Sequence, residues 1–173
     1  MELKCGPCTI RSWRHGDEVT LPLHANNRRI WINLRDRFPH PYTRADAEQW
    51  IRHITVKTPE TNFAIDVDGE AVGGIALVLQ DDVDRCSAEV GYWLSEQYWG
   101  RGIVTAALKA ITDYAFKHLE LTRVFAVPFA HNTASARVLE KAGYRREARM
   151  RRSAIKDGVV LDQFLYAKTD DDQ

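Results

Sequence analysis

A short glycine turn offers the clearest chemistry in the sequence. Its six residues, Gln97-Tyr98-Trp99-Gly100-Arg101-Gly102, lie between a segment with strand-like alternation and a segment with helical periodicity. The free N–H groups at a helix N-terminus point outward, and the helix dipole favours negative charge there. Glycines have no Cβ, so phosphate oxygens can approach the backbone, and Arg101 can add a mobile positive charge. The turn therefore predicts a site for a ligand that carries phosphate.

Two other phosphate-binding motifs fit this turn poorly. A dinucleotide fingerprint needs a third glycine, where this chain has Thr105, and an acidic residue about 20 positions later. A Walker A loop needs Gly-Lys-Ser/Thr, whereas Ile103 and Val104 follow Gly102. Two glycines at this spacing arise by chance about once in a chain of this length, so a plain helix-entry turn is an equal alternative until context is added.

The elements on either side of the turn are well defined by their periodicity. Residues 87–94 alternate, which predicts a strand with Glu89 and Trp93 on one face and a notch at Gly91. Residues 103–118 carry apolar side chains at i, i+4, i+7 and i+11, which predicts a long helix. The turn is thus expected where a strand ends and a helix begins.

The remaining elements suggest a mixed α/β fold in a single domain, residues 1–173. We predict a helix over residues 43–56, opened by Thr43 and Asp46 in a capping box. Further predictions are a hairpin of residues 61–67 and 71–79, a strand at 123–127, a helix at 132–143, and a hairpin of residues 144–153 and 159–167. Before these come a strand at 9–12 and a helix at 17–26 that Pro22 opposes.

Two separated motifs together resemble one family. Gln97-x-x-Gly100-x-Gly102 is followed some thirty residues later by Asn132-x-x-Ser135 and by Glu140-Lys141-x-Gly143-Tyr144, a combination similar to the GNAT superfamily of N-acetyltransferases. The chain resembles more narrowly the Rim-type branch, which acetylates the N-termini of ribosomal proteins. The likeness runs from about Leu3 to Ala167 and includes Phe38-x-x-Pro41-Tyr42. It implies a bent, mostly antiparallel central sheet with a splayed strand pair, flanked by helices.

The resemblance also implies where acetyl-CoA binds. Its pantetheine arm would lie along the splayed strand, and its diphosphate over the turn and the first helical residues. Asn132 would bond the pantetheine, and Ser135 would lie near the thioester sulfur. In many members a tyrosine acid stands later on this helix, where this chain has Leu139. The implied coenzyme contacts are Tyr92, Trp93, Leu94, Gln97, Tyr98, Trp99, Gly100, Arg101, Gly102, Ile103, Val104, Thr105, Asn132 and Ser135.

Direct acetyl transfer to nitrogen needs a neutral amine, a polarised thioester carbonyl and a stabilised thiolate. A backbone N–H near Trp93 or Leu94 can stabilise the oxyanion, and Glu89 can take the proton of the amine directly or through water. Ser135 can only donate a hydrogen bond or relay a proton, because its hydroxyl is too weakly acidic to ionise. The structural alternatives are an ion-paired Glu89, a small residue in a first helical turn for Ser135, and a plain N-cap for Asn132.

Cys5-Gly6-Pro7-Cys8 spells the thioredoxin tetrapeptide and supplies a hypothesis from another class of protein. A redox CxxC site needs a preceding strand and a following helix, but only four residues precede Cys5 and a strand is predicted after Cys8. The context favours a turn with two inert, reduced thiols. With Cys86 there are three cysteines, and no cluster has zinc spacing, so neither a disulfide framework nor a metal is expected.

Composition restricts the partners that can be expected. The 24 lysines and arginines equal the 24 aspartates and glutamates, so no global charge draws the chain to nucleic acid or to an anionic membrane. No apolar run approaches about 20 residues and no secretory signal is recognised, so a cytoplasmic location is expected. A basic cluster, Arg145, Arg146, Arg149, Arg151 and Arg152, is expected at a solvated strand edge, with attraction of an acidic acceptor as its alternative.

The amine acceptor is the part of the function that the sequence leaves open. The segment 26–45, with Arg28, Arg29, Trp31, Arg35, His40 and Tyr42, is expected to shape the acceptor side. An N-terminal amine, with a reference pKa near 7.7–8.0, is about half neutral at working pH and needs little help from a base. A protein N-terminus of ribosomal type is therefore the first hypothesis, and a polyamine, an aminoglycoside or a similar amine is the second. A non-catalytic CoA-binding regulator is more remote, and a homodimer remains open.

Overall fold

The computed structural model describes residues 1–172 and divides into two compact units. The first unit contains residues 1–76 and 92–107, and the second contains residues 77–91 and those from 108 onward. Strands β4 and β5 and helix α4 contribute residues to both units, so the chain passes between them three times.

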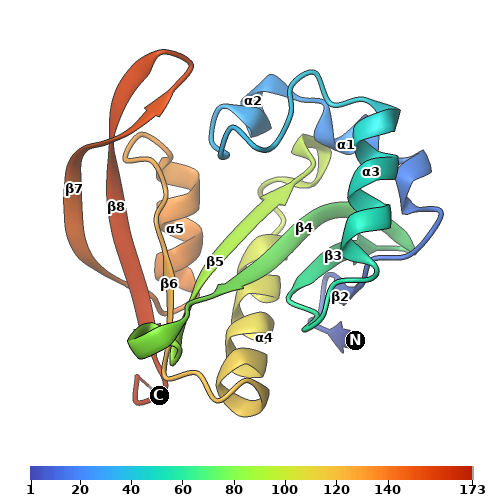
Figure 1. Cartoon of the computed structure of the whole chain (residues 1–173). Helices are drawn as coiled ribbons and strands as arrows, with labels where there is room; N and C mark the ends of the chain where they lie inside the picture. Colours follow the sequence, from blue (N-terminus) through green and yellow to red (C-terminus); the bar gives the residue numbers. More distant parts are fainter. Residues whose placement is uncertain (173) are drawn as a thin grey trace. The chain divides into compact units, whose positions relative to one another are not determined.

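The first unit is built on the strand order β1-β2-β3-β4-β5 (Figure 1). Neighbouring strands β1 to β4 are antiparallel. Its elements are β1 (Glu2–Lys4), β2 (Thr9–Ser12), the 3-10 turn η1 (Asp17–Val19), α1 (Leu21–Ala25), α2 (Arg28–Trp31), α3 (Arg44–Ile54), β3 (Asn62–Val67), most of β4 (Glu70–Leu79), the end of β5 (Ser87–Leu94), the 3-10 turn η3 (Glu96–Tyr98) and the start of α4 (Ile103–His118).

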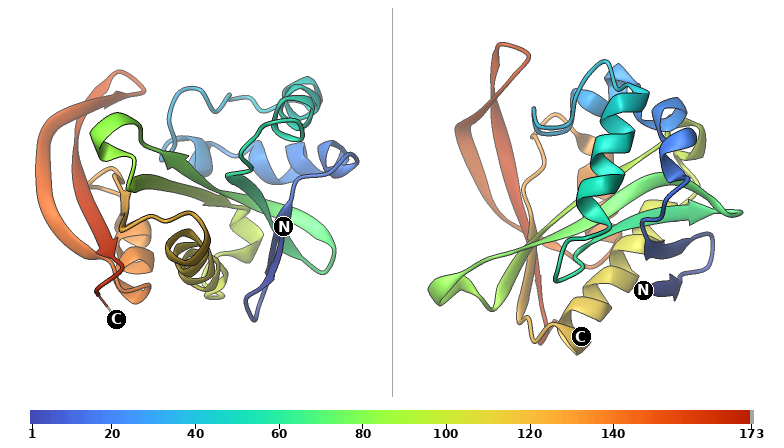
Figure 2. Two further views of the ribbon diagram at one scale, coloured as in Figure 1. Left: turned by 60° about the horizontal axis from the view of Figure 1, so that its bottom comes forward. Right: turned by 45° about the vertical axis from the view of Figure 1, so that its right-hand side comes forward.

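Helix α3 begins as the sequence predicts. The side chain of Thr43 accepts a hydrogen bond from the backbone N–H of Asp46, and the carboxylate of Asp46 accepts one from the backbone N–H of Thr43. This reciprocal capping box lowers the pKa of Asp46 below its ordinary value, because the hydroxyl and the N–H of Thr43 both bond its charged form. The helix lies with α1 over one face of the strands, as the left panel of Figure 2 shows, and buries Ala47, Ile51 and Ile54 there.

The second unit has the strand order β4-β5-β6-β8-β7. Its elements are the ends of β4 and β5 that the first unit lacks, the 3-10 turn η2 (Asp82–Asp84), most of α4, β6 (Arg123–Ala126), α5 (Thr133–Lys141), β7 (Arg145–Lys156) and β8 (Val159–Thr169). Strands β5 and β6 run parallel, whereas β6–β8 and β7–β8 are antiparallel. The predicted mixed α/β fold with a mostly antiparallel sheet is therefore confirmed.

The two Asp-Gly hairpins form where they were predicted. Asp68 and Gly69 have φ of 54° and 90°, and Asp157 and Gly158 have φ of 53° and 76°. Positive φ at both central residues is the requirement of the type I′ turn, whose twist matches that of the flanking strands. Strands β7 and β8 are longer than predicted, because β7 continues to Lys156 and β8 begins at Val159, directly on either side of the turn.

The N-terminal forty residues depart most from prediction. The single helix expected over residues 17–26 is two short elements, η1 and α1, and Pro22 lies in the first turn of α1. Proline is tolerated there because the N–H that it lacks would have no helical acceptor, so it begins a helix and does not break one. Strand β1 and helix α2 were not predicted, and both are only three or four residues long.

The arginine cluster of residues 145–152 lies on β7, the last strand in the order, and its side chains are exposed. Arg149 pairs with Asp162 at 2.7 Å, Arg145 pairs with Asp172 at 3.3 Å, and Arg146 lies over the ring of Phe164. The solvated edge that the sequence predicts is thus observed. Within residues 1–172 no helix has the length and apolarity needed to cross a bilayer.

Candidate active site

The predicted anion-binding turn lies entirely in the first unit, between β5 and α4. Gly100 and Gly102 have φ of 76° and 75°, a conformation that residues with a Cβ rarely adopt, so glycine is favoured at both positions. A Cβ placed on either glycine would meet nothing within 4 Å, and residues 99–102 are exposed. The backbone of the turn is therefore open to a ligand.

Helix α4 begins directly after this turn. The backbone N–H of Ala106 donates to the carbonyl of Gly102 at 3.0 Å. Ile103, Val104 and Thr105 precede Ala106 and form the first turn of α4. The backbone N–H groups of a first helical turn have no acceptor within the helix. With the dipole of a 16-residue helix behind them, these amides provide the donors that a diphosphate needs.

Contacts within the turn fix its shape. The indole Nε1 of Trp99 donates to the carbonyl of Leu94 at 2.8 Å, which closes the turn onto the end of β5. Arg101 donates to the carbonyl of Gln97 at 2.8 Å and lies over the ring of Tyr98 at 5.2 Å. The positive charge predicted at Arg101 is present at the turn, held by a hydrogen bond and a cation–π contact.

A second set of contacts reaches the turn from α1 and α2, and we call it the clamp. Glu96 accepts a hydrogen bond from Asn27 at 2.7 Å and forms an ion pair with Arg29, and Arg29 also lies over the ring of Trp99. His24 contributes through its Nδ1, 3.1 Å from the hydroxyl of Ser95. The clamp therefore consists of His24, Asn27 and Arg29 on one side and Ser95, Glu96 and Trp99 on the other.

His24 is oriented by a third residue. Its Nε2 lies 3.0 Å from a carboxylate oxygen of Glu70, which can only accept, so Nε2 donates. In the neutral ring Nδ1 is then the acceptor for the hydroxyl of Ser95. A carboxylate that orients the far nitrogen of a histidine fixes the tautomer, and this holds the start of the turn in one geometry.

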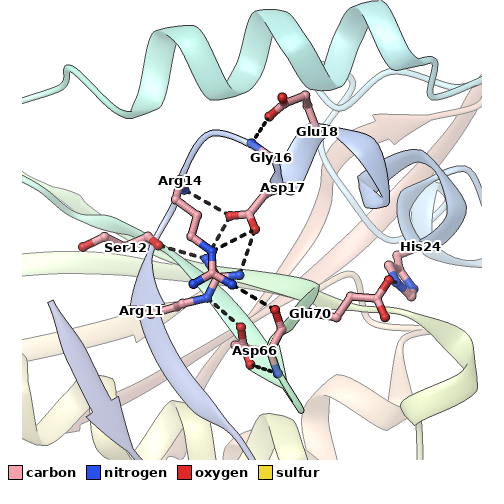
Figure 3. Close-up of polar contacts among 10 residues, drawn as sticks. Arg11, Ser12, Arg14, Gly16, Asp17, Glu18, His24, Asp66 and Glu70 are labelled. Carbon is pink, nitrogen blue, oxygen red and sulfur yellow. Dashed lines mark hydrogen bonds and ion pairs between the residues drawn. The ribbon is translucent and has the colours of Figure 1, made fainter.

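A buried ion cluster supports the segment that leads into α1 (Figure 3). The guanidinium of Arg11 donates two hydrogen bonds of 2.8 Å to the carboxylate of Asp17 and one of 2.6 Å to Asp66. All three side chains are nearly buried, so the two carboxylates compensate the desolvated charge of Arg11. The cluster joins β2, η1 and β3. Helix α1, which carries His24, follows η1 after one residue, so the cluster fixes the start of the segment that positions His24.

The end of β5 approaches β4 closely at a pair of glycines. A Cβ on Gly73 would lie 2.5 Å from the carbonyl oxygen of Trp93, and one on Gly74 would lie 2.8 Å from its indole nitrogen. Trp93 also packs edge-on against Phe38, with the ring centroids 5.6 Å apart. Within residues 1–172 the register between β5 and β6 covers Ser87 to Glu89, although β5 continues to Leu94. Tyr92, Trp93 and Leu94 thus lie beyond the residues of β5 that pair with β6.

The other predicted site residues lie in the second unit. Glu89 is half-buried on β5, opposite Phe125 of β6. Asn132 caps α5, and its side-chain oxygen accepts from the backbone N–H of Ser135 at 3.1 Å. The structural alternative for Asn132 is thus observed, while its amide NH₂ group is not used by that cap. Ser135 is half-buried in the first turn of α5.

Leu139, which stands at the position of the tyrosine acid, is fully buried in the core. Two tyrosines of the same unit are also buried: Tyr144 shares a hydrogen bond of 2.7 Å with Thr112, and Tyr166 donates to Glu140 at 3.0 Å. Burial and the nearby carboxylate of Glu140 raise the pKa of Tyr166 above its ordinary value. These tyrosines therefore act as packed core groups.

The segment 26–45 contributes Asn27 and Arg29 to the clamp, packs Phe38 against Trp93 and makes several contacts within itself. Trp31 stacks on His40 with the ring centroids 5.6 Å apart, and Arg28 lies over Trp31. Tyr42 belongs to the buried core, and burial raises its pKa to about 12. Tyr42 is therefore a packing residue, whereas Arg29 serves the clamp.

Comparison with known proteins identifies the family. Residues 8–145 match the family described as "Acetyltransferase (GNAT) domain". The Bacillus subtilis protein named "Putative ribosomal N-acetyltransferase YdaF" is 37% identical over 100 residues, which are 58% of this chain and 54% of that protein. "Probable N-acetyltransferase YjcK" of the same species is 39% identical over 121 residues, 68% of this chain and 67% of that one. The chain thus spans about half the length of the first relative and two thirds of the second.

A more distant relative and a solved structure complete the comparison. Spermidine N(1)-acetyltransferase of Escherichia coli is 29% identical over 115 residues, 61% of each protein. The structure of Mycobacterium smegmatis RimJ in complex with CoA-disulfide has a TM-score of 0.85 and 25% identity, over 99% of this chain and 87% of that one. The family match covers well over half of the sequence, and the fold agrees with it. The chain therefore belongs to the GNAT acetyltransferase family.

Proposed function

We propose that this chain transfers the acetyl group of acetyl-CoA directly to a primary amine. The observation that carries the proposal is the open turn at Gly100 and Gly102, which leads directly into the first turn of α4. Family membership favours coenzyme A as the phosphate-bearing ligand of this turn, and RimJ, a structural neighbour, is described in complex with CoA-disulfide. The diphosphate would bind over residues 97–102 and the amides of Ile103, Val104 and Thr105.

The clamp supports this proposal on energetic grounds. A loop that must become ordered when it binds a ligand loses part of the binding free energy to that ordering. Here Trp99, Glu96 and Ser95 are already held by hydrogen bonds, so the amides are preorganised for the anion. Little binding free energy would therefore be lost in ordering the turn.

The chemistry proposed for the remaining residues is modest. A backbone N–H at Trp93 or Leu94 would stabilise the oxyanion of the tetrahedral intermediate, and Glu89 would accept the proton of the amine, directly or through water. Asn132 would bond the pantetheine through its amide NH₂ group, and Ser135 would donate a hydrogen bond to the departing sulfur. The C–N bond forms when the amine adds to the thioester carbonyl, and the C–S bond breaks when the tetrahedral intermediate collapses and releases the thiolate of coenzyme A, so no covalent acetyl-enzyme is needed.

For the acceptor we propose a protein N-terminal amine of ribosomal type. The description of YdaF as a ribosomal N-acetyltransferase favours this class, and such an amine is already partly neutral near pH 8. A small-molecule amine is the second candidate, favoured by the match to spermidine N(1)-acetyltransferase. Mass spectrometry of products from acetyl-CoA with a peptide set and a small-amine panel distinguishes the two. Acetylation of small amines alone would reject the first candidate.

The coenzyme site is tested by Gly100→Asp with Gly158→Asp as its control. Both glycines have a φ of 76° and open space where a Cβ would lie, so aspartate costs about the same backbone strain, on the order of 1 kcal/mol, at each. Only at Gly100 would the carboxylate face the diphosphate. We expect isothermal titration to show acetyl-CoA binding lost in Gly100→Asp and retained in Gly158→Asp. Equal affinities in the two variants would refute this placement.

A further inference from the structure

The hairpin between β1 and β2 carries a pair of thiols that acetyl transfer does not use. Cys5 and Cys8 flank the two-residue loop Gly6-Pro7, next to the paired residues Lys4 and Thr9. The backbone N–H of Cys5 donates to the carbonyl of Cys8 at 3.0 Å, and the two sulfurs are 3.2 Å apart. Both thiols are free in this structure.

This backbone geometry allows the two sulfurs to bond. Disulfides join residues whose Cα atoms lie about 4.4–6.8 Å apart, and the backbone hydrogen bond across the Gly6-Pro7 loop holds Cys5 and Cys8 at about this separation. The sulfurs already face each other, so closure needs side-chain rotation and little backbone movement. Gly6, with a φ of 77°, provides the tight loop that brings the two cysteines together.

The two thiols differ in exposure and in acidity. Cys5 is partly exposed, whereas Cys8 is only 6% exposed and its sulfur lies 3.8 Å from the carbonyl of Ile103. The hydrogen bond from Cys8 lowers the pKa of Cys5 below its ordinary value. That same bond and burial raise the pKa of Cys8. Cys5 is therefore the more accessible and more acidic thiol, and Cys8 is the protected partner whose hydrogen bond favours the ionised form of Cys5.

We propose that Cys5 and Cys8 form a redox-active dithiol, which a small-molecule disulfide such as glutathione disulfide oxidises to an intramolecular disulfide. The thiolate of Cys5 attacks one sulfur of the oxidant, and the first glutathione thiolate leaves and takes up the proton released by Cys5. Cys8 then loses its proton to solvent and attacks the sulfur of Cys5, and the second glutathione leaves as a thiolate that is protonated. The two cysteines lose two electrons, and one glutathione disulfide becomes two glutathione thiols.

The second step is favoured by the first. Hydrogen bonding to Cys5 and the negative charge of Cys5 are two of the causes that raise the pKa of Cys8. Both disappear when Cys5 is in the mixed disulfide, so Cys8 becomes easier to ionise as soon as it is needed. This arrangement does not require the helix that follows a thioredoxin CxxC, because β2 follows Cys8 and the paired sulfur supplies the stabilisation.

The test uses the full chain, glutathione redox buffers, and Cys86 as an internal control. Cys86 is the third thiol and is exposed, so accessibility alone would make it react first. After incubation, free thiols are alkylated and mapped by peptide mass spectrometry. We expect Cys5 and Cys8 to become protected together as a disulfide, with Cys5 reacting about tenfold faster than Cys86 because Cys8 stabilises the thiolate of Cys5 and then resolves its mixed disulfide.

Single substitutions separate the two steps. Cys8→Ser should accumulate a glutathione adduct on Cys5, Cys5→Ser should leave Cys8 unreacted because it is buried, and Cys86→Ser should behave as the unmodified chain. The proposal would be overturned if Cys5 and Cys8 stayed reduced, and were therefore alkylated, in every oxidising glutathione buffer. It would also be overturned if glutathione adducts formed on Cys86 alone. Should a substitution prevent folding, the mapping of the unmodified chain decides by itself, and its outcome is independent of acetyl transfer.

Discussion

The glycine turn before α4 and the entrance of α5 are both predicted to contact coenzyme A, yet they are held in different ways. At α5 the cap joins Asn132 to Ser135, three residues apart. At the turn, Ser95 and Glu96 are held by His24, Asn27 and Arg29, which lie 67 to 71 positions away in the sequence. One region depends on local sequence, and the other depends on the tertiary fold.

This difference has consequences for substitution. The geometry of a locally determined site survives changes elsewhere, whereas a turn held by distant partners is altered when those partners or their supporting strands change. We therefore expect the turn to respond to substitutions outside its own motif. At α5 we expect a substitution to remove only the interactions of the side-chain group that is deleted, and we expect substitutions elsewhere to have little effect.

The largest effect is expected from Gly73→Ala. The new Cβ would lie 2.5 Å from the carbonyl oxygen of Trp93, and because that atom belongs to the backbone the end of β5 must move. Overpacking of this kind costs about 3 kcal/mol, measurable by urea unfolding, and should weaken acetyl-CoA binding as well. Gly91→Ala is the matched control, since a Cβ there meets nothing within 4 Å, and it should leave the free energy of unfolding nearly unchanged. Similar losses in both variants would contradict a tight approach of β4 to β5.

Glu96→Ala should weaken coenzyme binding with little effect on stability. The substitution removes the carboxylate that accepts hydrogen bonds from both Asn27 and Arg29. The turn must then become ordered when acetyl-CoA binds, and this ordering reduces the free energy of acetyl-CoA binding. We expect an increase of about fivefold to tenfold in the Kd of acetyl-CoA by calorimetry, while exposed ion pairs contribute at most about 1 kcal/mol to folding. Glu48→Ala, which breaks the exposed pair between Arg44 and Glu48, is the control and should change neither quantity. An unchanged Kd in Glu96→Ala would show that the clamp is not needed.

The same contrast separates what the sequence could predict from what it could not. Helix α4 is found at its predicted bounds, and the capping box of Thr43 and both Asp-Gly turns form as predicted, because each is determined by neighbouring residues. Strand β1 and helix α2 are too short to show periodicity. The clamp was missed because His24, Asn27 and Glu96 are ordinary polar residues at no recognisable spacing, brought together only by the fold.

Asn132→Ser distinguishes a cap from a coenzyme contact at α5. Serine is as good an N-cap as asparagine, so the free energy of unfolding should change by less than about 0.5 kcal/mol. The amide NH₂ group is lost, and if it bonds the pantetheine the Kd of acetyl-CoA should rise about fivefold, the value of one hydrogen bond. Asn132→Ala, which removes the cap as well, should in addition destabilise the chain by about 1 kcal/mol. An unaltered affinity in Asn132→Ser would leave Asn132 as a helix cap alone.

The smallest effect is expected from Ser135→Ala. If the hydroxyl donates to the departing sulfur, its interaction strengthens only as negative charge develops, so kcat should fall about threefold while KM stays the same. Thr133→Ala is the matched control, because Thr133 carries an exposed hydroxyl in the same helical turn. Steady-state kinetics with one amine acceptor measures both variants. An equal loss of kcat in the two variants would attribute the effect to the helical turn. A rise in KM alone would make Ser135 a binding residue, because an interaction made equally in the ground state and the transition state does not lower the barrier.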